Sequence, residues 1–415
     1  MGIEHEKVLF YCRGDHPYLA QDMAKEAKEV LYYTPILGPH PVSRDDQIGA
    51  GLDGVEKIDD FEAYKDKVDL IVFPGVYDGE KCDSLRKEGH KVFGAGMSEE
   101  IELNRVLFLN TLEKVGLPVI PTYIADGIDD AIKYLTGKED KWLKTPYCRG
   151  DFDTMHFHNM ATHEPWFNWL RNKLGKRGSD TIEILIQDSF PCVCETGGDR
   201  YCIDGEYTKK GTIGYEVKDK GYIYRVVKEM PKAVNDIDMK MAPEFKRFGY
   251  RGAYSTELRI NKKGEIRFTD LTARFGSPPG EGQFLTWKKF GQAMSDIADG
   301  KVPVLEENAE YGAIIILTSW FNEDNEICVE FPKEFEDNIK LKNDYKHEGK
   351  YYCVPNESDG FFGAVVTVGK SVKEVTEKAK EIASEVHCIG LEYDESVFDK
   401  AQEAIESGKQ FGVIL

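Results

Sequence analysis

The segment Glu257-Leu-Arg-Ile-Asn-Lys-Lys-Gly-Glu-Ile-Arg-Phe-Thr-Asp-Leu-Thr-Ala-Arg-Phe-Gly276 has the pattern of a β-hairpin. Two partly apolar stretches flank Asn261-Lys-Lys-Gly264, a short loop typical of a turn between antiparallel strands. The acids Glu257 and Asp270 fall on neighbouring strands, and the short turn could place both carboxylates on one face. Such oxygen ligands suit Mg²⁺, which binds one or two carboxylates together with phosphate oxygens and water. A surface hairpin with cross-strand ion pairs would also explain these acids.

Cationic side chains accompany the predicted hairpin. Arg259 and Arg274 supply planar guanidinium groups that can bind phosphate through two parallel hydrogen bonds. Upstream, Lys141-Trp-Leu-Lys144 predicts a strand that ends at Lys144, before the Gly-containing segment Cys148-Arg-Gly-Asp-Phe-Asp153. An ammonium group at that position suits a triphosphate, although a lysine at a strand end is more often simply solvated.

Two further patterns lie between these segments. Glu183–Phe190 is an apolar strand that ends in polar residues, among them Gln187 and Asp188, and Glu195 follows shortly after. This edge could border an adenine, but a plain buried strand fits equally well. His156 and His158 alternate along a predicted strand and would share a face, so a metal pair is conceivable, yet no third ligand is visible.

The flanking regions predict two different kinds of sheet. Short apolar runs at Lys7–Tyr11, Asp69–Phe73 and Lys91–Gly94, with a helix expected at Tyr18–Val30, indicate a parallel sheet covered by helices. Ligands of such sheets collect at the carboxyl ends of the strands. A second helix is expected to begin at the Ser98 cap.

The C-terminal region predicts an α+β segment that begins near Tyr311. Ala313–Leu317 and Ala364–Val368 are apolar strand candidates, and Ser371-x-x-Glu374 has the spacing of a capping box that opens a helix. With 415 residues the chain exceeds one compact core, so we expect three lobes, at residues 1–120, 121–310 and 311–415.

Composition narrows the classes of function. Hydrophobic residues make up 41% and charged residues 31%, as in an ordinary globular protein, and no apolar run approaches the roughly 20 residues that cross a bilayer. The formal net charge of −20 argues against general nucleic-acid or membrane-surface binding, because both partners attract Lys and Arg. The nine scattered cysteines lack the paired spacing of a structural zinc site, so we expect reduced thiols and a cytoplasmic protein.

The order of these segments resembles the phosphoribosylamine–glycine ligase branch of the ATP-grasp superfamily. Asp270-Leu-Thr-Ala-Arg-Phe-Gly-Ser-Pro278 is similar to the signature Glu-x-Asn-x-Arg-x-Gly-Asp-Pro, without a gap. Asn104-Arg105 falls where the family has a Ser-Lys pair, and Leu117–Tyr123 is similar to its Gly-Ile-Pro-Thr-Ala run. The resemblance implies an ATP-grasp fold of mixed α/β and α+β class, with an N-terminal Rossmann-like lobe and a C-terminal α+β lobe.

The resemblance also implies roles for individual residues. Arg105 and Lys144 would contact phosphates, and Arg274, with Arg259 and Lys144 as further catalytic candidates, would reach phosphate or an acyl phosphate. Magnesium, or manganese in its place, would be held by Glu257, Asp270 and Thr272. The adenosine of ATP would be bordered by Gln187, Asp188 and Glu195.

Departures from the family pattern fall at phosphate and magnesium positions and, in the loops and turns, where the substrates would bind. Arg replaces the family's Lys at 105, Asp replaces Glu at 270, and Thr replaces Asn at 272. The long Gly-rich phosphate loop is replaced by Cys148–Asp153, and the N-terminal Gly-rich turn by Cys12-Arg-Gly-Asp-His16. Because Asp reaches less far than Glu and Thr is a poorer ligand than Asn, the second magnesium position is the one most affected.

The expected activity is therefore an ATP-dependent ligation of a small carboxylate, such as an amino acid, to an amine through an acyl phosphate. A peptide-type ligase and a non-catalytic ATP-binding sensor or scaffold are the alternatives. The expected partners are the small-molecule carboxylate and amine, and a homodimer is compatible with the family resemblance.

Overall fold

The computed structural model describes residues 2–35, 44–146, 154–355 and 360–410. By its internal contacts the chain divides into two compact units. The larger unit comprises Met1–Glu99, Cys194–Leu258 and Thr269–Leu415, and the smaller comprises Glu100–Val193 and Arg259–Phe268. The three lobes expected at 1–120, 121–310 and 311–415 stay a prediction, and the predicted loop Cys148–Asp153 lies outside the described residues, which resume at Thr154.

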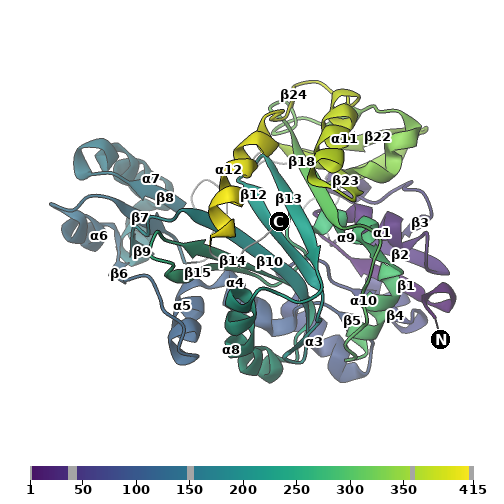
Figure 1. The fold of residues 1–415 in the computed structure, drawn as a ribbon, viewed down its shortest axis with the longest axis horizontal. Helices are drawn as coiled ribbons and strands as arrows, with labels where there is room; N and C mark the ends of the chain where they lie inside the picture. Colours follow the sequence, from purple (N-terminus) through teal and green to yellow (C-terminus); the bar gives the residue numbers. More distant parts are fainter. Residues whose placement is uncertain (1, 36–43, 147–153, 356–359, 411–415) are drawn as a thin grey trace. The chain divides into compact units, whose positions relative to one another are not determined.

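The larger unit begins with a parallel sheet in the order β3-β2-β1-β4-β5, as Figure 1 shows. Its strands are β1 (Lys7–Tyr11), β2 (Glu29–Tyr33), β3 (Val55–Lys57), β4 (Leu70–Val72) and β5 (Val92–Phe93), and its helices are α1 (Pro17–Met23), α2 (Phe61–Tyr64) and α3 (Gly79–Glu88). Val8, Leu9 and Phe10 of β1 are fully buried, because a central parallel strand is covered on both faces. The expected α/β character of this region is confirmed.

Two sequence-based boundaries in this region are wrong. The helix expected at Tyr18–Val30 ends at Met23, and Glu29–Tyr33 instead forms β2, whose Val30 pairs with Val8 of β1. The helix expected to start at Ser98 is interrupted, because the side chain of Asn104 accepts a hydrogen bond from Leu107 N and caps a new helix. The two resulting helices are α4 (Glu100–Leu103) and α5 (Arg105–Lys114).

A ten-stranded sheet runs in the order β15-β14-β10-β12-β13-β18-β23-β20 within the described residues, with β11 and β24 paired to β10 and β18. Its strands are β10 (Cys194–Ile203), β11 (Glu206–Tyr207), β12 (Gly211–Val217), β13 (Gly221–Val227), β14 (Arg251–Ile260), β15 (Ile266–Thr272), β18 (Tyr311–Ser319), β20 (Ile339–Leu341), β23 (Phe361–Gly369) and β24 (Leu391–Glu392). The hairpin predicted around Asn261–Gly264 is confirmed as β14 and β15, and the two C-terminal apolar strands are confirmed as the antiparallel pair β18 and β23.

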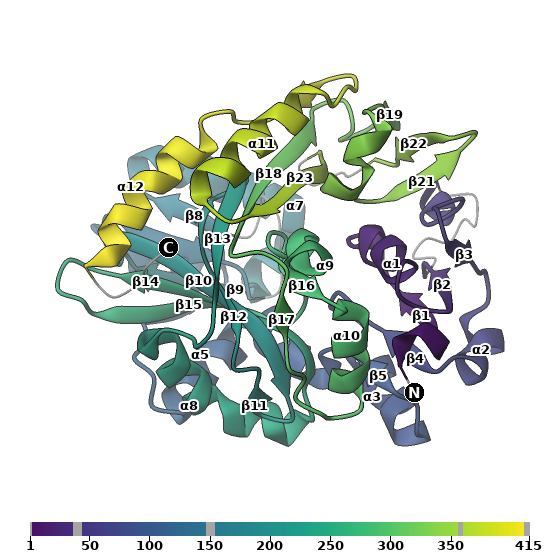
Figure 2. The same ribbon diagram turned by 45° about the vertical axis from the view of Figure 1, so that its right-hand side comes forward.

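Helices cover this sheet within the larger unit. Figure 2 shows α11 (Val372–Ser384) along β18 and β23, and α12 (Val397–Lys409) across β12 and β13. The Ser371 cap is confirmed, since its side chain accepts a hydrogen bond from Glu374 N. The remaining elements of this unit are α8 (Lys232–Phe248), α9 (Gln283–Thr286), α10 (Phe290–Ala298), the pair β16 (Trp287–Lys288) and β17 (Glu306–Glu307), and the small sheet β19 (Ile327–Val329), β22 (Lys350–Cys353) and β21 (Asp344–His347).

The smaller unit is built on an antiparallel sheet in the order β6-β9-β7-β8. Its elements, besides α4 and α5, are β6 (Thr122–Asp126), α6 (Ile128–Leu135), β7 (Lys141–Lys144), β8 (Thr154–Phe157), α7 (Met160–Thr181) and β9 (Glu183–Asp188). Phe167 of α7 packs into the core of this unit with Ile128 and Ile186. The strands expected at Lys141–Lys144 and up to Asp188 are confirmed.

Two absences bear on the expectations from composition. Within the described residues, none of the helices combines the length and apolarity that crossing a bilayer requires. The eight cysteines of the described chain are all free thiols, which agrees with the expectation of reduced cysteines.

Candidate functional site

The smaller unit brings together two of the predicted phosphate-binding residues. Lys144 is the last residue of β7. The Arg105 guanidinium, at the start of α5, donates a hydrogen bond of 2.7 Å to the backbone carbonyl of Thr145, and the Arg105 amide donates to the carbonyl of Pro146. The sequence separates Arg105 and Lys144 by a strand, a helix and two loops, yet the fold holds both cations at the same strand end.

The predicted adenosine-bordering residues of β9 lie in the same unit, and their side chains are engaged. Gln187 donates a hydrogen bond to Thr122 Oγ1, and Asp188 accepts one of 2.7 Å from the ammonium group of Lys141. The Asp188 amide donates to the carbonyl of Pro121. The role of both residues at an adenine stays a prediction.

The hairpin acids stand in different surroundings. Thr269 Oγ1 donates a hydrogen bond of 2.8 Å to Glu257 Oε1, so Glu257 and Thr269 face each other across β14 and β15. Asp270 is exposed, and its carboxylate accepts a hydrogen bond from the Leu271 amide. Thr272 is partly buried, and Arg259 belongs to the smaller unit. Joint metal binding by Glu257, Asp270 and Thr272 stays a prediction.

A carboxylate that sequence reasoning missed lies near Glu257. Glu216 of β12 is in the same sheet and is exposed, yet nearby atoms that displace water, together with the negative charges of Glu257, Asp219 and Glu195, raise the pKa of its carboxyl group. Like charges that crowd in this way favour a bound cation, because a cation removes their mutual repulsion. In the sequence, Glu216 stands near the end of a strand with an otherwise apolar pattern. This position is the signal that could have identified it.

A polar cluster lies at the carboxyl end of β1, where the sequence predicts ligand binding, with Asp15 exposed and His16 buried. Arg13 forms a bidentate ion pair with Asp78, in which the guanidinium group donates two hydrogen bonds of 2.7 Å to the two carboxylate oxygens. Nearby atoms that displace water tend to raise the pKa of the Asp15 carboxyl group, but the cations around it, including Lys342 and Arg274, lower it overall. Asp15 is therefore ionised at neutral pH.

His16, the next residue, is almost completely buried and neutral. Its pKa is lowered to about 3, mainly by burial and also by the positive charges of Lys342 and Arg274, against the opposing charge of Asp15. Its Nδ1 lies 2.6 Å from the hydroxyl oxygen of Tyr18, while Nε2 has no hydrogen-bond partner in the described chain. One polar atom of this cluster is thus left for a further partner.

Arg274 is held at this cluster by its neighbour. The Phe275 amide donates to the carbonyl of Pro74, just beyond β4, and the Phe275 ring stacks on Phe93 at 5.5 Å between ring centroids. Glu281, also buried, is hydrogen-bonded by Ser277 through one oxygen, while its other oxygen has no partner in the described chain. Burial raises the pKa of the Glu281 carboxyl group.

Within the described residues the histidine pair meets no third metal ligand. His156 Nε2 lies 2.7 Å from a carboxylate oxygen of Asp140, and the His156 ring stacks on Trp142. The rings of His158 and His163 are close by, but nowhere in the described residues do three or more His, Cys, Asp or Glu side chains meet as metal ligands would.

A similar fold occurs in solved structures. Phosphoribosylamine–glycine ligase from Thermotoga maritima matches with a TM-score of 0.71 at 17% sequence identity, over 94% of this chain and 99% of that one. The chain has the ATP-grasp fold. Biotin carboxylase from Campylobacter jejuni matches with a TM-score of 0.64 at 12% identity, over 96% of this chain and 99% of that one.

A third ATP-grasp structure, L-amino acid ligase from Bacillus licheniformis, matches with a TM-score of 0.61 at 14% identity, over 94% of this chain and 99% of that one. No family model and no curated protein matches the sequence. The likeness is therefore one of fold, and the chemistry depends on this chain's own residues.

Those residues fit the groups that the ATP-grasp fold implies. The carboxylates of Glu216, Glu257 and Glu195 gather negative charge on one sheet, which fits a hard divalent cation such as Mg²⁺. Arg105 beside the Lys144 strand end provides positive charge of the kind that a triphosphate needs.

Proposed function

We propose that this protein is an ATP-dependent ligase that joins a small carboxylate, such as an amino acid, to an amine. The observation that carries the proposal is that the negative charges of Glu257, Glu216 and Glu195 act on one another within an ATP-grasp sheet. Such a group of charges suits a divalent cation, which a nucleotide triphosphate needs for the reaction. Glu257, Asp270 and Thr272 would hold Mg²⁺, or Mn²⁺ in its place. The bound cation would neutralise the charge that develops on the phosphoryl group.

In the proposed reaction a carboxylate oxygen of the substrate attacks the γ-phosphorus of ATP and ADP leaves. The nitrogen of the amine then attacks the acyl carbon, phosphate leaves, and the nitrogen loses a proton, which gives the amide. Lys144 and Arg105 would orient the phosphates, Arg274 and Arg259 would stabilise the transferred phosphoryl group, and Gln187, Asp188 and Glu195 would border the adenosine.

The substrates would be recognised at the polar cluster beside β1. Arg274 offers a cation to a carboxylate, and ionised Asp15 offers an acceptor to the N–H groups of an amine. Phosphoribosylamine–glycine ligase and L-amino acid ligase, two proteins of similar fold, are named for amine and amino-acid substrates. The replaced turn Cys12–His16 supports an amine different from phosphoribosylamine.

The decisive experiment measures ADP release with MgATP while glycine and the other amino acids are combined with phosphoribosylamine and a panel of nucleotide amines. We expect ADP release only when one acid and one amine are both present. In Arg274→Ala, neither the acid nor the amine should any longer stimulate ADP release. Release with two amino acids alone would identify a peptide-type ligase instead.

A non-catalytic role is the second candidate, and the altered residues Arg105, Asp270 and Thr272 favour it. Magnesium-dependent ATP binding without ADP release for any substrate pair would establish a sensor or scaffold. Such a result would disprove the ligase proposal.

A further inference from the structure

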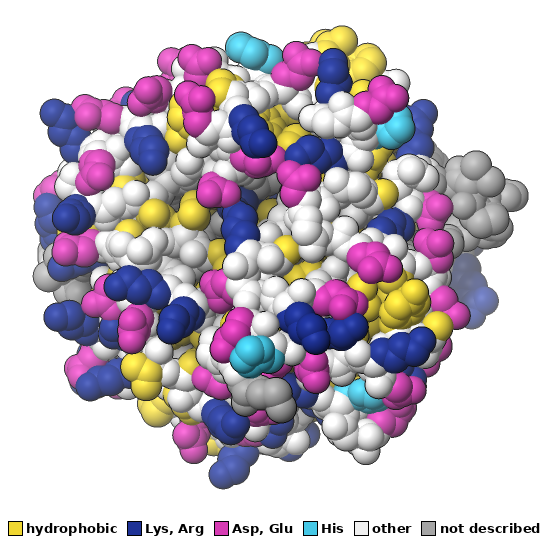
Figure 3. All heavy atoms as spheres, turned by 90° about the vertical axis from the view of Figure 1, so that its right-hand side faces the viewer, with side chains coloured by type: hydrophobic (Ala, Val, Ile, Leu, Met, Phe, Trp, Pro, Cys, Tyr) yellow, Lys and Arg dark blue, Asp and Glu magenta, His cyan; other side chains and the backbone are white. Residues whose placement is uncertain are grey.

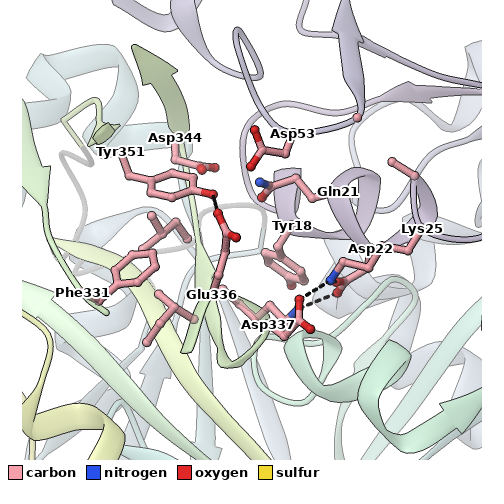
Figure 4. A pocket seen from close by; sticks show the side chains of 15 residues that line it. Tyr18, Gln21, Asp22, Lys25, Asp53, Phe331, Glu336, Asp337, Asp344 and Tyr351 are labelled. Atoms are coloured by element: carbon pink, nitrogen blue, oxygen red, sulfur yellow. Dashed lines mark hydrogen bonds and ion pairs between the residues drawn. The ribbon is translucent and has the colours of Figure 1, made fainter. Parts of the chain in front are cut away.

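A cavity of about 230 Å³ lies inside the larger unit, and neither Asp15, His16 nor Arg274 lines it. Its walls come from α1 on one side and from the segment between β19 and β22 on the other, as Figure 4 shows. Figure 3 shows this face of the molecule hollowed near its centre, with acidic and basic side chains around the opening. Five carboxylates line the cavity: Asp22, Asp53, Glu336, Asp337 and Asp344.

Four of these carboxylates are paired with lysines. Lys25 lies 2.8 Å from Asp22 and 2.6 Å from Asp337, and buried Lys340 lies 2.6 Å from Asp22. On the opposite side, Lys346 lies 2.5 Å from Asp53 and 3.2 Å from Glu336. Three ammonium groups are therefore paired with four carboxylates. The lining has fewer positive than negative charges, and its net charge remains negative.

Asp344, the fifth carboxylate, has no such partner. The residue is fully buried, and neither of its carboxylate oxygens has a hydrogen-bond partner in the described chain. Figure 4 shows its carboxyl group pointing across the gap toward Asp53 and Gln21. Because a buried carboxylate without a donor is costly, a ligand that brings N–H groups and positive charge would be bound favourably here.

The remaining walls indicate what kind of cation fits. Tyr18, Phe331 and Tyr351 contribute aromatic rings, whose faces attract organic cations. No three His, Cys, Asp or Glu side chains of the described chain converge as metal ligands would, so a bare metal ion lacks a coordination sphere. The volume corresponds to roughly eight waters at about 30 Å³ each, which limits the ligand to a small molecule.

We propose that this cavity is a second ligand site, which binds a small organic molecule through a primary ammonium group. The ammonium group donates to Asp344 and Glu336, and the aliphatic part of the ligand lies against the rings of Tyr18 and Phe331. The site is separate from the ligase chemistry proposed above, and its occupation can be measured as binding alone.

The test is calorimetric titration and thermal unfolding of the full chain with 1,4-diaminobutane, with 1,4-butanediol as the neutral probe of matching length. We expect saturable binding and a rise in Tm with the diamine and neither with the diol. Asp344→Asn should weaken binding at least tenfold, and Glu336→Gln should weaken it severalfold. Asp324→Asn, an exposed position outside the cavity, is the matched control and should bind like the wild type.

The outcomes separate the proposal from its rivals. Equal binding by the wild type, Asp344→Asn and Glu336→Gln would place the diamine elsewhere and overturn the proposal. An equal rise in Tm with potassium chloride would assign the site to an alkali cation and overturn the ligand class. An absence of saturable binding by the wild type would also overturn it. If Asp344→Asn fails to fold, diamine binding by Glu336→Gln is compared with diamine binding by the Asp324→Asn control, and this comparison decides the question.

Discussion

The Arg105 guanidinium donates a 2.7 Å hydrogen bond to the carbonyl of Thr145, the residue that directly follows Lys144. This hydrogen bond links the start of α5 to the end of β7. Arg105 and Lys144, the two cations predicted to bind phosphate, are therefore held at the same strand end. A bound triphosphate would meet a strand end whose position depends on Arg105 as well as on Lys144.

Arg105→Ala is expected to lower kcat/KM for ATP by about 10- to 100-fold, because both a phosphate cation and the support of the strand end are lost. Arg105→Lys should restore part of the loss, since an ammonium group can supply one of the two functions. ATP affinity and steady-state kinetics measure the effect, with Lys114→Ala at the far end of α5 as the control. Wild-type kinetics in Arg105→Ala would refute the phosphate role.

Glu257→Gln is expected to reduce turnover by about 100-fold or more at fixed magnesium, because the neutral amide keeps the shape of the side chain and removes its charge. Added Mg²⁺ or Mn²⁺ should recover part of the activity. Glu265→Gln, in the exposed loop of the same hairpin, is the control and should leave magnesium dependence unchanged. Equal turnover in Glu257→Gln and the wild type would remove Glu257 from the metal site.

Arg200 and Asp238 form a buried ion pair that ties β10 to α8, and both side chains are almost inaccessible to solvent. Arg200→Met is expected to cost about 3–5 kcal/mol of unfolding free energy, because Asp238 is left as an uncompensated buried charge. The double variant Arg200→Met/Asp238→Leu should recover much of that loss. Urea unfolding of the two single variants and the double variant measures the coupling, and additive effects would contradict it.

Acid should destabilise the fold through His16. Its pKa is about 3 in the folded protein and near its ordinary value of 6.5 when unfolded, because burial disfavours the charged imidazole beside Lys342 and Arg274. The unfolded chain therefore takes up a proton first, and stability falls as the pH drops below 6.5. Between pH 7 and pH 4.5 this loss is about 2–3 kcal/mol.

His16→Gln should make the unfolding free energy less dependent on pH over that interval, and urea unfolding at the two pH values measures the difference. His5→Gln, at an exposed histidine, serves as the control. Identical pH dependence in His16→Gln and the wild type would show that His16 is protonated in the folded state.

Elements with strong local patterns were predictable. The Asn261–Gly264 turn, the apolar strands β18 and β23, and the Ser371 cap all depend on neighbouring residues, and all are present in the structure. The strand β2 was missed because Lys25-Glu-Ala-Lys28 has high helix propensity just before it. Pairing of Val30 with Val8, a contact between distant residues, outweighs that local preference.

The candidate site was predictable only in part. Residues carried by short motifs, such as Lys144, Glu257 and Arg274, could be selected from the sequence. The cluster that surrounds Arg274 could not, because Asp15 and Lys342 are more than 300 positions apart and meet only through tertiary packing. Glu216 was missed for a similar reason, since its importance comes partly from Glu257 and Glu195, which lie on other strands of the sheet.

Tyr18 has two roles that concern different parts of the larger unit. Its ring forms a wall of the carboxylate-lined cavity, while its hydroxyl oxygen lies 2.6 Å from His16 Nδ1. Any substitution that reshapes the cavity at this position also removes the hydrogen bond of the histidine. A change at position 18 therefore affects both regions at once, and a lineage that altered one region through Tyr18 would have to compensate in the other.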